Sequence, residues 1–504
     1  MTFATKLMVD SLIKELVKLL DEISHYSDVH RQKNQDYQSV QKLLNVFFNS
    51  ISSGQSDVSR TQRLLPVNDG TETGRNRPIA RNLFESDIVL TVDQLKRIVM
   101  AEKQQHMGNH RRSRRKVITG SIYRWPRNRN IPYEFVSSDA LNFWQRETCV
   151  RWEENGSGYD RVIFFRGSGC YSNVGRTGGR QEISIGYGCD NVGIVSHEIG
   201  HSLGFWHEQS RPDRDQYIKL QNKYIIRGTQ GNFIKRSYLE TESMGVPFDL
   251  GSVMHYGPNA FSTDWNHRTI ETVDKRYSHT IGQRHGPSFI DIKQINRLYC
   301  HHKCATSLLA CQNGGYPDPN NCQLCKCPTG LGGVTCADVQ PSSCGGELIA
   351  TSVWQRLAYR GSHKCYWRIR VIFLNLQQIM REYVLKLNRL LFGVTLPVSC
   401  GSEPVNVLSD QAEVLVIFDA AELGQDGSFS LRYIIDSGRP LPKAPLPIWI
   451  PGSEDRLFRG HEIDKNGLVE KFILNAIPKI RDPQQPAVSI ASIVTEFTLE
   501  KILG

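Results

Sequence analysis

The 504-residue sequence contains no run of 18 consecutive apolar residues, so it predicts no integral membrane segment. Cysteine is absent before Cys149, yet the chain holds 13 cysteines in all, and six of them fall between Cys304 and Cys336. Such crowding is typical of extracellular modules that disulfides stabilise. The length exceeds that of one ordinary hydrophobic core, so we expect roughly two to four domains in an extracellular protein.

The N-terminus lacks the basic, apolar and small-residue regions of a secretory signal peptide. Residues 1–23 instead place their apolar side chains on one face of a predicted helix, with acids and lysines between them. Either the signal peptide is missing from this version of the chain, or the cysteine pattern misleads. We favour a mis-assigned start and therefore expect a secreted protein.

The formal net charge of +10 does not by itself predict nucleic-acid binding, which needs basic and aromatic residues interleaved on a folded face. Much of the charge lies in residues 110–116, between a Gln-, Asn- and Ser-rich segment without cysteine and the aromatic, cysteine-bearing part of the chain. The run Arg112-Ser113-Arg114-Arg115 has the dibasic spacing that secretory proprotein convertases accept. We therefore predict cleavage between Arg115 and Lys116, with a solvated basic linker as the alternative.

Glycine-bounded runs of β-forming residues between positions 161 and 189 predict a short sheet. After it, apolar residues recur with a helical period, and Asp190 or Asn191 is a plausible N-cap for the helix that comes next. Three histidines lie in and after this helix, within the sequence HEIGHSLGFWH at residues 197–207. The segment therefore predicts a helix that carries two histidines and a turn that carries the third.

His197 and His201 are four residues apart, so they project from the same side of the predicted helix. Gly204 tolerates a left-handed turn, which ends the helix and returns His207 toward the same point. Three converging neutral imidazoles with an open position predict a catalytic zinc site. Glu198 would then take a proton from the zinc-bound water, whose pKa the metal lowers to about 7. A lone H-x-x-x-H often arises by chance, but the full H-E-x-x-H-x-x-G-x-x-H spacing is far more specific.

The sequence HEIGHSLGFWHE resembles the metzincin zinc peptidases, and the glutamate after the third histidine, followed by QSRPDRD, is similar to the astacin family in particular. A second signature, SVMHY at residues 252–256, is similar to the family's methionine turn. The resemblance implies one Zn²⁺ per catalytic domain, above an apolar floor formed by Met254. It also implies that Tyr256 is the mobile tyrosine that hydrogen-bonds to the oxyanion of the tetrahedral intermediate. Without the resemblance, both residues would be read as packing residues.

The resemblance also implies a latent precursor. Glu208 would bind the ammonium group of the new N-terminus after cleavage behind Arg115, so the first residues of the catalytic domain would be disordered in the uncut chain. Upstream, LFESDIVL is similar to the F-x-G-D element of astacin propeptides, in which an aspartate occupies the open zinc position. Asp87 is the corresponding residue, although Ser86 stands where the family has glycine. An ordinary surface acid is the alternative for Glu208, and an exposed loop acid is the alternative for Asp87.

Cysteine spacing resembles that of known extracellular modules. The family's nested pairing implies the disulfides Cys149–Cys300 and Cys170–Cys189. The next six cysteines resemble an EGF-like module, with the implied pairs Cys304–Cys322, Cys311–Cys325 and Cys327–Cys336. A zinc knuckle is the alternative, although the spacing lacks two matched C-x-x-C pairs. The module has little core and would depend on its bridges.

Four further runs, CGGELIATS, KCYWRI, VLVIFDA and GSFSLRYIID, resemble the first and last strands of a CUB domain, with Cys344 and Cys365 as its disulfide. Its middle is atypical, because FLNLQQIMREYVLKLNRLL is helix-like and Cys400 has no fourth cysteine to pair with. The proline-rich stretch after Ser437 suits a stiff linker, and the remaining residues have helical patches but no motif.

Together these features predict an α+β fold: a two-lobed metzincin catalytic domain with a twisted sheet and an active-site helix, then a small disulfide-rich EGF-like module and a β-sandwich CUB-like module. The expected segments are an N-terminal region and propeptide (1–115), an astacin-like peptidase domain (116–302), an EGF-like module (303–337), a CUB-like module (344–436) and an unassigned tail (437–504).

The predicted function is that of a secreted, latent zinc endopeptidase that cleaves extracellular proteins or peptides and is activated by a proprotein convertase. GCYSNVGR at residues 169–176 resembles the strand that holds an extended substrate by adding it to the sheet. Asn155 begins the only clear N-glycosylation sequon, which agrees with secretion. Similarity to nematode astacins implies processing of extracellular matrix or cuticle, by analogy alone. An inactive extracellular binding scaffold is the alternative, and it would show a lost histidine or a replaced Glu198.

Overall fold

The computed structural model describes residues 40, 42, 44, 64–98, 116–134, 139–237, 240–242, 244–371, 407–408, 413–420, 426–436 and 487–497. The chain divides into two compact units, the first holding nearly all residues up to Thr329 and the second most residues from Asp338 onward. The helix predicted near the N-terminus, the dibasic stretch through Arg115 and the cysteine at position 400 lie outside the described residues. No helix in the described ranges is long and apolar enough to cross a membrane.

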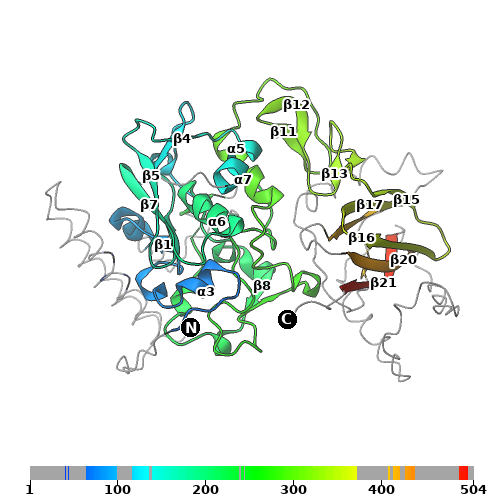
Figure 1. Cartoon of the computed structure of the whole chain (residues 1–504), viewed down its shortest axis with the longest axis horizontal. Helices are drawn as coiled ribbons and strands as arrows, with labels where there is room; N and C mark the ends of the chain where they lie inside the picture. Colours follow the sequence, from blue (N-terminus) through cyan, green and yellow to red (C-terminus); the bar gives the residue numbers. More distant parts are fainter. Residues whose placement is uncertain are drawn as a thin grey trace. The chain divides into compact units, whose positions relative to one another are not determined.

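A mixed six-stranded sheet dominates the first unit (Figure 1). Its strands are β1 (Ile88–Val89), β3 (Ile131–Glu134), β4 (Trp152–Glu154), β5 (Arg161–Phe165), β6 (Cys170–Asn173) and β7 (Arg180–Ile185). Their order is β1-β6-β7-β5-β3-β4, and β6 and β7 form the antiparallel pair. The turn between these two strands contains Gly178 and Gly179 at φ values of 86° and 65°, which other residues rarely adopt. The segment predicted to form a sheet therefore supplies β5, β6 and β7.

Three helices lie along one side of this sheet in Figure 1. They are α5 (Asp139–Glu147), α6 (Val192–Ser202) and α7 (Phe289–Tyr299), and a shorter helix, α3 (Glu72–Asn76), precedes them in the chain. The Asn191 side chain accepts a hydrogen bond from Gly193 N, which makes it the N-cap of α6. Ser288 and Asp291 form a capping box at the start of α7, which satisfies two otherwise unpaired backbone donors.

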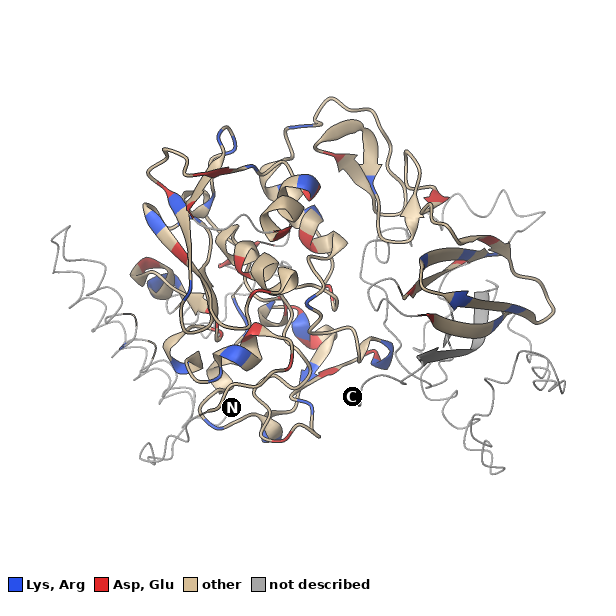
Figure 2. Cartoon of the chain, viewed as in Figure 1, with Lys and Arg blue, Asp and Glu red and all other residues tan. Residues whose placement is uncertain are grey.

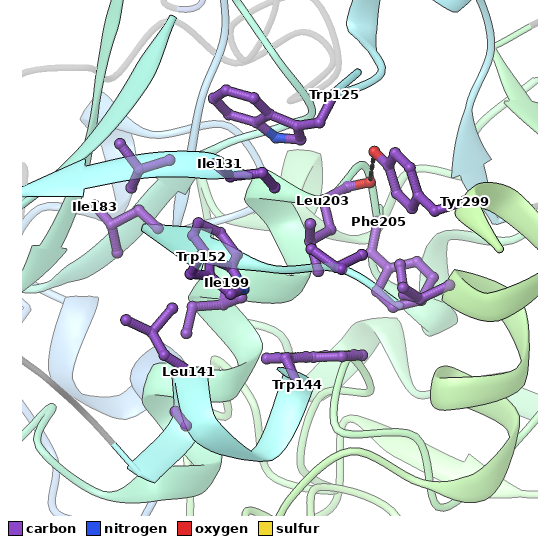
Figure 3. Close-up of a cluster of buried hydrophobic side chains, with 14 of the residues drawn as sticks. Trp125, Ile131, Leu141, Trp144, Trp152, Ile183, Ile199, Leu203, Phe205 and Tyr299 are labelled. Carbon is purple, nitrogen blue, oxygen red and sulfur yellow. Dashed lines mark hydrogen bonds between the residues drawn. The ribbon is translucent and has the colours of Figure 1, made fainter. Parts of the chain in front are cut away.

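The main hydrophobic core lies between the sheet and these helices. Figure 3 shows Trp144 of α5, Ile199 of α6 and Ile183 of β7 within one cluster of fully buried side chains. Tyr299 of α7 closes this core by donating a hydrogen bond of 2.9 Å to the carbonyl of Leu203. One face of α6 packs into this core, which fixes the orientation of the helix. The opposite face carries His197 and His201.

Smaller elements complete the first unit. Its other strands form antiparallel pairs, β2 (Val117–Ile118) with β9 (Thr241–Glu242), β8 (Ile218–Leu220) with β10 (Ile270–Thr272), and β11 (Tyr316–Asp318) with β12 (Asn321–Lys326). Single 3₁₀ turns occur at Ala80–Asn82, Ser121–Tyr123, Glu208–Ser210, Arg214–Gln216, Asn222–Tyr224, Gln230–Phe233 and Lys275–Tyr277. In the view of Figure 2, basic and acidic residues are interspersed along the described ribbon of this unit.

Six disulfides cross-link the described cysteines. The structure joins Cys149 to Cys300, Cys170 to Cys189, Cys304 to Cys322, Cys311 to Cys325, Cys327 to Cys336 and Cys344 to Cys365. The first of these spans a sequence separation of 151 residues and ties the end of α7 to the segment between α5 and β4. Such a long closed loop restricts the unfolded chain strongly, which stabilises the folded unit.

The second unit contains two β-sheets that share one hydrophobic core. One sheet has the order β15-β17-β19 and the other β16-β20-β21-β18, while β13 and β14 pair separately. Trp367 of the first sheet and Phe429 of the second lie 5.3 Å apart between ring centroids, so the sheets pack face to face. The strands are β13 (Leu331–Gly332), β14 (Asp338–Val339), β15 (Gly345–Ile349), β16 (Gln355–Gly361), β17 (Lys364–Arg370), β18 (Val407–Leu408), β19 (Glu413–Asp419), β20 (Gly427–Asp436) and β21 (Ala487–Phe497).

Strand β21 corrects the reading of the C-terminal tail. After residue 436 the sequence indicated a stiff linker and helical patches without a motif, yet Ala487–Phe497 is a strand that pairs antiparallel with both β20 and β18. The run AVSIASIVTEF is rich in β-branched residues, and this signal was available in the sequence. The sandwich therefore includes a strand from beyond the predicted CUB-like boundary. The helix-like run FLNLQQIMREYVLKLNRLL lies outside the described residues.

Candidate active site

Helix α6 carries the first two histidines of the site. His197 and His201 are both fully buried, and their Nε2 atoms lie 3.0 Å apart. The helix ends before Gly204, whose φ of 113° requires glycine and turns the chain back. His207 follows this turn, with its ring centroid 5.3 Å from that of His197 and 4.8 Å from that of His201. The structure thus brings the three sequence-predicted ligands together.

Hydrogen bonds at Nδ1 orient all three rings. Each Nδ1 faces an oxygen acceptor: His197 the Val253 carbonyl at 2.8 Å, His201 the Phe205 carbonyl at 2.8 Å, and His207 the Glu85 carboxylate at 2.7 Å. A ring that donates from Nδ1 keeps the lone pair of its Nε2 free for a metal. The three Nε2 atoms therefore point at one centre as potential ligands.

Asp87 supplies a carboxylate at the same centre. Its Oδ2 lies 3.0 Å from Nε2 of His207 and 3.4 Å from Nε2 of His197, and its Oδ1 lies 3.7 Å from Nε2 of His201. The preceding Ser86 adopts a φ of 69°, a left-handed conformation that glycine adopts without strain. Ser172 N donates to the Asp87 carbonyl at 2.9 Å, so strand β6 holds the backbone of Asp87 in place.

These four residues fit a zinc ion. Their ligating atoms all lie within 4.8 Å of one another, and every one of the four side chains is buried. Within the described ranges, Oδ1 of Asp87 has no hydrogen-bond partner, although a buried carboxylate oxygen normally requires one. Imidazole nitrogens with one carboxylate oxygen are a donor set that tetrahedral zinc accepts. When bound in an open three-histidine site, zinc polarises water and lowers its pKa to about 7.

Glu198 lies beside the first histidine with a buried carboxylate. Among the described residues, neither of its oxygens accepts a hydrogen bond. Burial raises the pKa of Glu198 well above its usual value, and the nearby charges of Asp87 and Glu72 raise it further. A carboxylate with a raised pKa and open lone pairs is suited to accept and return a proton.

The methionine turn packs beneath the site. Met254 is fully buried, and a Cβ placed on Gly200 of α6 would approach its sulfur to 3.0 Å, so the two lie in close contact. Tyr256 is also buried, and its ring centroid lies 4.8 Å from that of His207. Its hydroxyl donates to the Glu85 carbonyl at 2.5 Å and lies 3.2 Å from the Ser86 hydroxyl. In the uncut chain, the segment before β1 therefore holds the tyrosine.

Glu208 contacts the side-chain ammonium group of Lys116, and not the amino group of a new N-terminus. Its Oε2 lies 3.0 Å from Nζ of Lys116, and both side chains are fully buried. In the same uncut chain, Val117 and Ile118 form β2, which pairs with β9. The expectation that these first residues of the catalytic domain are disordered before cleavage is therefore wrong, because a buried ion pair and a strand ladder already fix them.

Two arginine contacts near the site were missed by the sequence analysis. Arg284 donates from Nε and Nη2 to both carboxylate oxygens of Glu72, at 2.6 and 2.5 Å, and all these groups are buried. Arg236 lies 3.2 Å from Oε1 of Glu85 and packs its guanidinium 4.6 Å from the ring centroid of Phe84. The pair from Glu72 to Arg284 spans 212 positions, so no local pattern could have predicted it.

Two further predicted sites are the glycosylation sequon and the cleavage site. Asn155, at the proposed glycosylation sequon, is exposed and adopts a φ of 53°. Arg115 lies outside the described residues, and Lys116 is the first described residue after it.

Comparison with known proteins places this geometry in a family. The family model for astacin, a family of peptidases, matches residues 117–300. The chain is 49% identical to zinc metalloproteinase nas-30 of Caenorhabditis elegans, over 98% of its own length and 71% of that protein. The chain belongs to the astacin family. It is accordingly a zinc metalloendopeptidase that uses one Zn²⁺, for which His197, His201 and His207 are the candidate ligands.

Other astacins match over shorter stretches. Zinc metalloproteinase nas-37 of Caenorhabditis elegans is 44% identical over 66% of this chain, which spans about half of that protein (46%). The solved structure of high choriolytic enzyme 1, a hatching enzyme zinc-protease from the medaka fish Oryzias latipes, is 38% identical over 34% of this chain and 88% of its own, with a TM-score of 0.31. Protein substrates follow from membership of the astacin peptidase family.

Proposed function

We propose that the chain is the latent precursor of a secreted astacin that cleaves extended polypeptides of the extracellular matrix or cuticle. The observation that carries the latency is the Asp87 carboxylate, which lies within 3.0 to 3.7 Å of one nitrogen of each candidate zinc ligand. A carboxylate in that position competes for the open coordination site, so the precursor has no activated water. Removal of the segment up to Arg115 by a proprotein convertase then opens the site.

Further contacts support the same proposal. Strand β1 (Ile88–Val89) forms the edge of the sheet and pairs with β6, and an extended substrate would add to β6 in its place. Glu72 neutralises Arg284, and its Oε1 lies 4.0 Å from Nε2 of His197. The segment before the cut therefore fills both the strand edge and the space next to the histidines.

The proposed catalytic roles follow from positions around that centre. Glu198 is the general base, because its carboxylate is buried beside His197 with open lone pairs. Tyr256 supplies a hydroxyl donor for the oxyanion once Glu85 and Ser86 have left with the cleaved segment. Met254 supports α6 from below, and β6 orients the substrate backbone.

Secretion and the accessory modules are part of the proposal. Six disulfides are expected of an extracellular chain, and the exposed Asn155 is accessible for glycosylation. We assign residues 303–337 to an EGF-like module and residues 344–436, together with β21, to a CUB-like sandwich. The role in matrix or cuticle rests on the resemblance to nematode astacins.

The experiment that tests latency compares Asp87→Ala with the wild-type precursor, both uncut. We expect the variant to hydrolyse a short quenched peptide, whereas the wild-type precursor does so only after cleavage behind Arg115. Asp93→Ala is the matched control, because Asp93 is an exposed acid of the same segment. An uncut Asp87→Ala chain as inactive as the wild type, together with full activity after cleavage of both, would contradict the proposed block.

A further inference from the structure

Lys116 places a charged ammonium group inside the catalytic domain. Its Nζ lies 2.6 Å from Oδ1 of Asp291, 3.0 Å from Oε2 of Glu208 and 2.8 Å from the Ser252 hydroxyl, and it packs 4.6 Å from the ring centroid of Phe205. Burial lowers the pKa of Lys116, but the charges of Asp291 and Glu208 outweigh that effect and raise it above its usual value. The two carboxylates therefore favour the charged form of this buried ammonium group.

The three polar partners of this ammonium belong to three different parts of the active site. Glu208 directly follows the histidine at position 207, Ser252 begins the methionine turn, and Asp291 lies in the first turn of α7. Asp291 also accepts a hydrogen bond of 2.9 Å from Val253 N. The carbonyl of Val253 in turn orients the ring of His197. Lys116 thus joins the elements that position two of the three candidate zinc ligands.

The backbone nitrogen of Lys116 makes a different contact. It donates to the Glu242 carbonyl at 3.0 Å, at the end of the β2–β9 ladder, and the Lys116 carbonyl accepts from Trp206 N. Glu208, by contrast, already faces donors with both oxygens. Its Oε1 accepts from Arg211 and from Asp249 N, at 3.1 and 2.8 Å, and its Oε2 faces Nζ.

We propose that the ε-ammonium of Lys116, and not the amino group created by cleavage, neutralises Glu208 both before and after activation. This inference rests on the proposed cleavage behind Arg115. Lys116 is then a positioning residue whose contacts are already formed in the precursor. Activation therefore removes the inhibitory segment without rearranging the contacts of Glu208. It follows that the position of the new N-terminus can shift upstream without loss of activity, whereas the lysine side chain is required.

Two complementary variants distinguish the role of the Lys116 side-chain nitrogen from that of the new α-amino group. One precursor carries a single glycine inserted between Arg115 and Lys116, which moves the new amino group one residue away but keeps Nζ. The other carries Lys116→Met, which removes Nζ but leaves a free amino group at position 116 after cleavage. Lys219→Met is the control, because Lys219 is an exposed lysine of strand β8. Lys116→Arg tests for rescue by a second long cation.

The measurements are the thermal midpoint and kcat/KM of each cut protein, with the midpoint of each uncut precursor. We expect the glycine insertion to match the wild type and Lys116→Met to lower both midpoints by on the order of 10 °C, because breaking a buried ion pair leaves carboxylates uncompensated. We expect Lys116→Arg to recover part of the loss and Lys219→Met to change nothing.

The opposite pattern would overturn the inference: a loss of midpoint and kcat/KM on glycine insertion, with Lys116→Met equal to the wild type. Failure of the convertase cut would instead count against the proposed function. It leaves the comparison of uncut precursors intact, in which an unchanged midpoint for Lys116→Met would itself contradict the role of the lysine.

Discussion

At the scale of single residues, the site combines three histidines with carboxylates in different states. The carboxylate of Glu198 is buried without a hydrogen-bond partner among the described residues, while that of Asp87 faces the histidine nitrogens. Glu72 and Glu85 lie nearby, each paired with an arginine. Of these four carboxylates, only that of Glu198 lies within the stretch that matches the astacin family model, so the proposed cleavage would leave it as the proposed base.

We predict that Glu198→Gln lowers kcat of the cut enzyme by about 10²- to 10⁴-fold, the usual contribution of a positioned general base. The amide keeps the size of the side chain but cannot accept the proton. Zinc content should stay unchanged, because the three histidines remain. Metal analysis and steady-state kinetics on the same preparation check both points, and a variant with wild-type kcat would remove Glu198 from the mechanism.

Asp249 gives a pH dependence of stability. Its burial, followed by the charge of Asp291, raises its pKa to about 6 in the folded protein, above the value near 3.8 of a free aspartate. Between these values the folded state binds a proton that the unfolded state does not, so stability falls as the pH rises from about 4 through about 6. The side chain of Asp249→Asn stays neutral at every pH. The free energy of unfolding of this variant should therefore fall less over the interval than that of the wild type, with a difference between the two proteins on the order of 3 kcal/mol.

Denaturant unfolding of both proteins at pH 4.5 and pH 7 provides the comparison for Asp249→Asn. The difference in stability between the two pH values should be smaller in the variant. An equal or larger difference would show that this carboxyl group is ionised over the whole interval.

Sequence reasoning identified residues whose roles depend on spacing and missed those whose roles depend on tertiary contact. The intervals between His197, His201 and His207 follow from one helix and one glycine turn, so the convergence could be predicted. The Lys116 side chain reaches Asp291 across 175 positions, and no periodicity encodes such a contact. The resemblance directed attention to the backbone ammonium, whereas the side chain of the same residue occupies the pocket.

At the scale of elements, strand β6 links the proposed latency to the proposed substrate binding. In the precursor, Ile88 and Val89 of β1 pair in parallel with Ser172 and Asn173 of β6. The Asn173 side chain donates a further hydrogen bond of 2.8 Å to the Val89 carbonyl. Removal of β1 leaves β6 as an unpaired edge, which is the template that an extended peptide requires.

We predict that cleavage behind Arg115 increases hydrogen exchange at the backbone amide of Ser172, which donates to the Asp87 carbonyl in the precursor. Strand β5 (Arg161–Phe165) is the internal control, because β3 and β7 cover both of its edges. Hydrogen exchange measured by mass spectrometry before and after the cut tests this expectation. Equal protection of β6 in both forms would contradict release of the strand.

Elements with strong local patterns were predictable. Helix α6 follows from its apolar period and Asn191 cap, and β5 and β7 follow from their β-branched and aromatic residues. The β-branched run of β21 was a local signal that was overlooked, whereas its pairing with β20 could not be predicted because the two strands are distant in sequence. The pairing between β2 and β9 was also missed. The two strands are distant in sequence, and each has only two residues, which is too short for a recognisable strand pattern.

At the scale of the whole molecule, the described chain consists of a catalytic unit and a β-sandwich unit, each with its own core. The α+β class of the catalytic unit could be predicted from the histidine helix and the flanking strands, and astacin family membership agrees with it. The limits of the sandwich could not be predicted from the sequence, because its last strand comes after a long stretch without a recognisable motif. The charge excess likewise says little about partners, because much of it lies in residues 110–116, at the predicted cleavage site. Along the described ribbon of the catalytic unit, acids and bases are interspersed (Figure 2).

The central claim is that one zinc ion, held by His197, His201 and His207, supplies the activity of the cut chain. Metal analysis of the cut, purified protein, combined with peptide hydrolysis during chelation and zinc return, tests it most directly. We predict one zinc atom per chain, activity that falls in step with zinc removal, and recovery when zinc is restored. A cut protein that hydrolyses peptide with no bound zinc, or that resists complete removal of the metal, would contradict the claim.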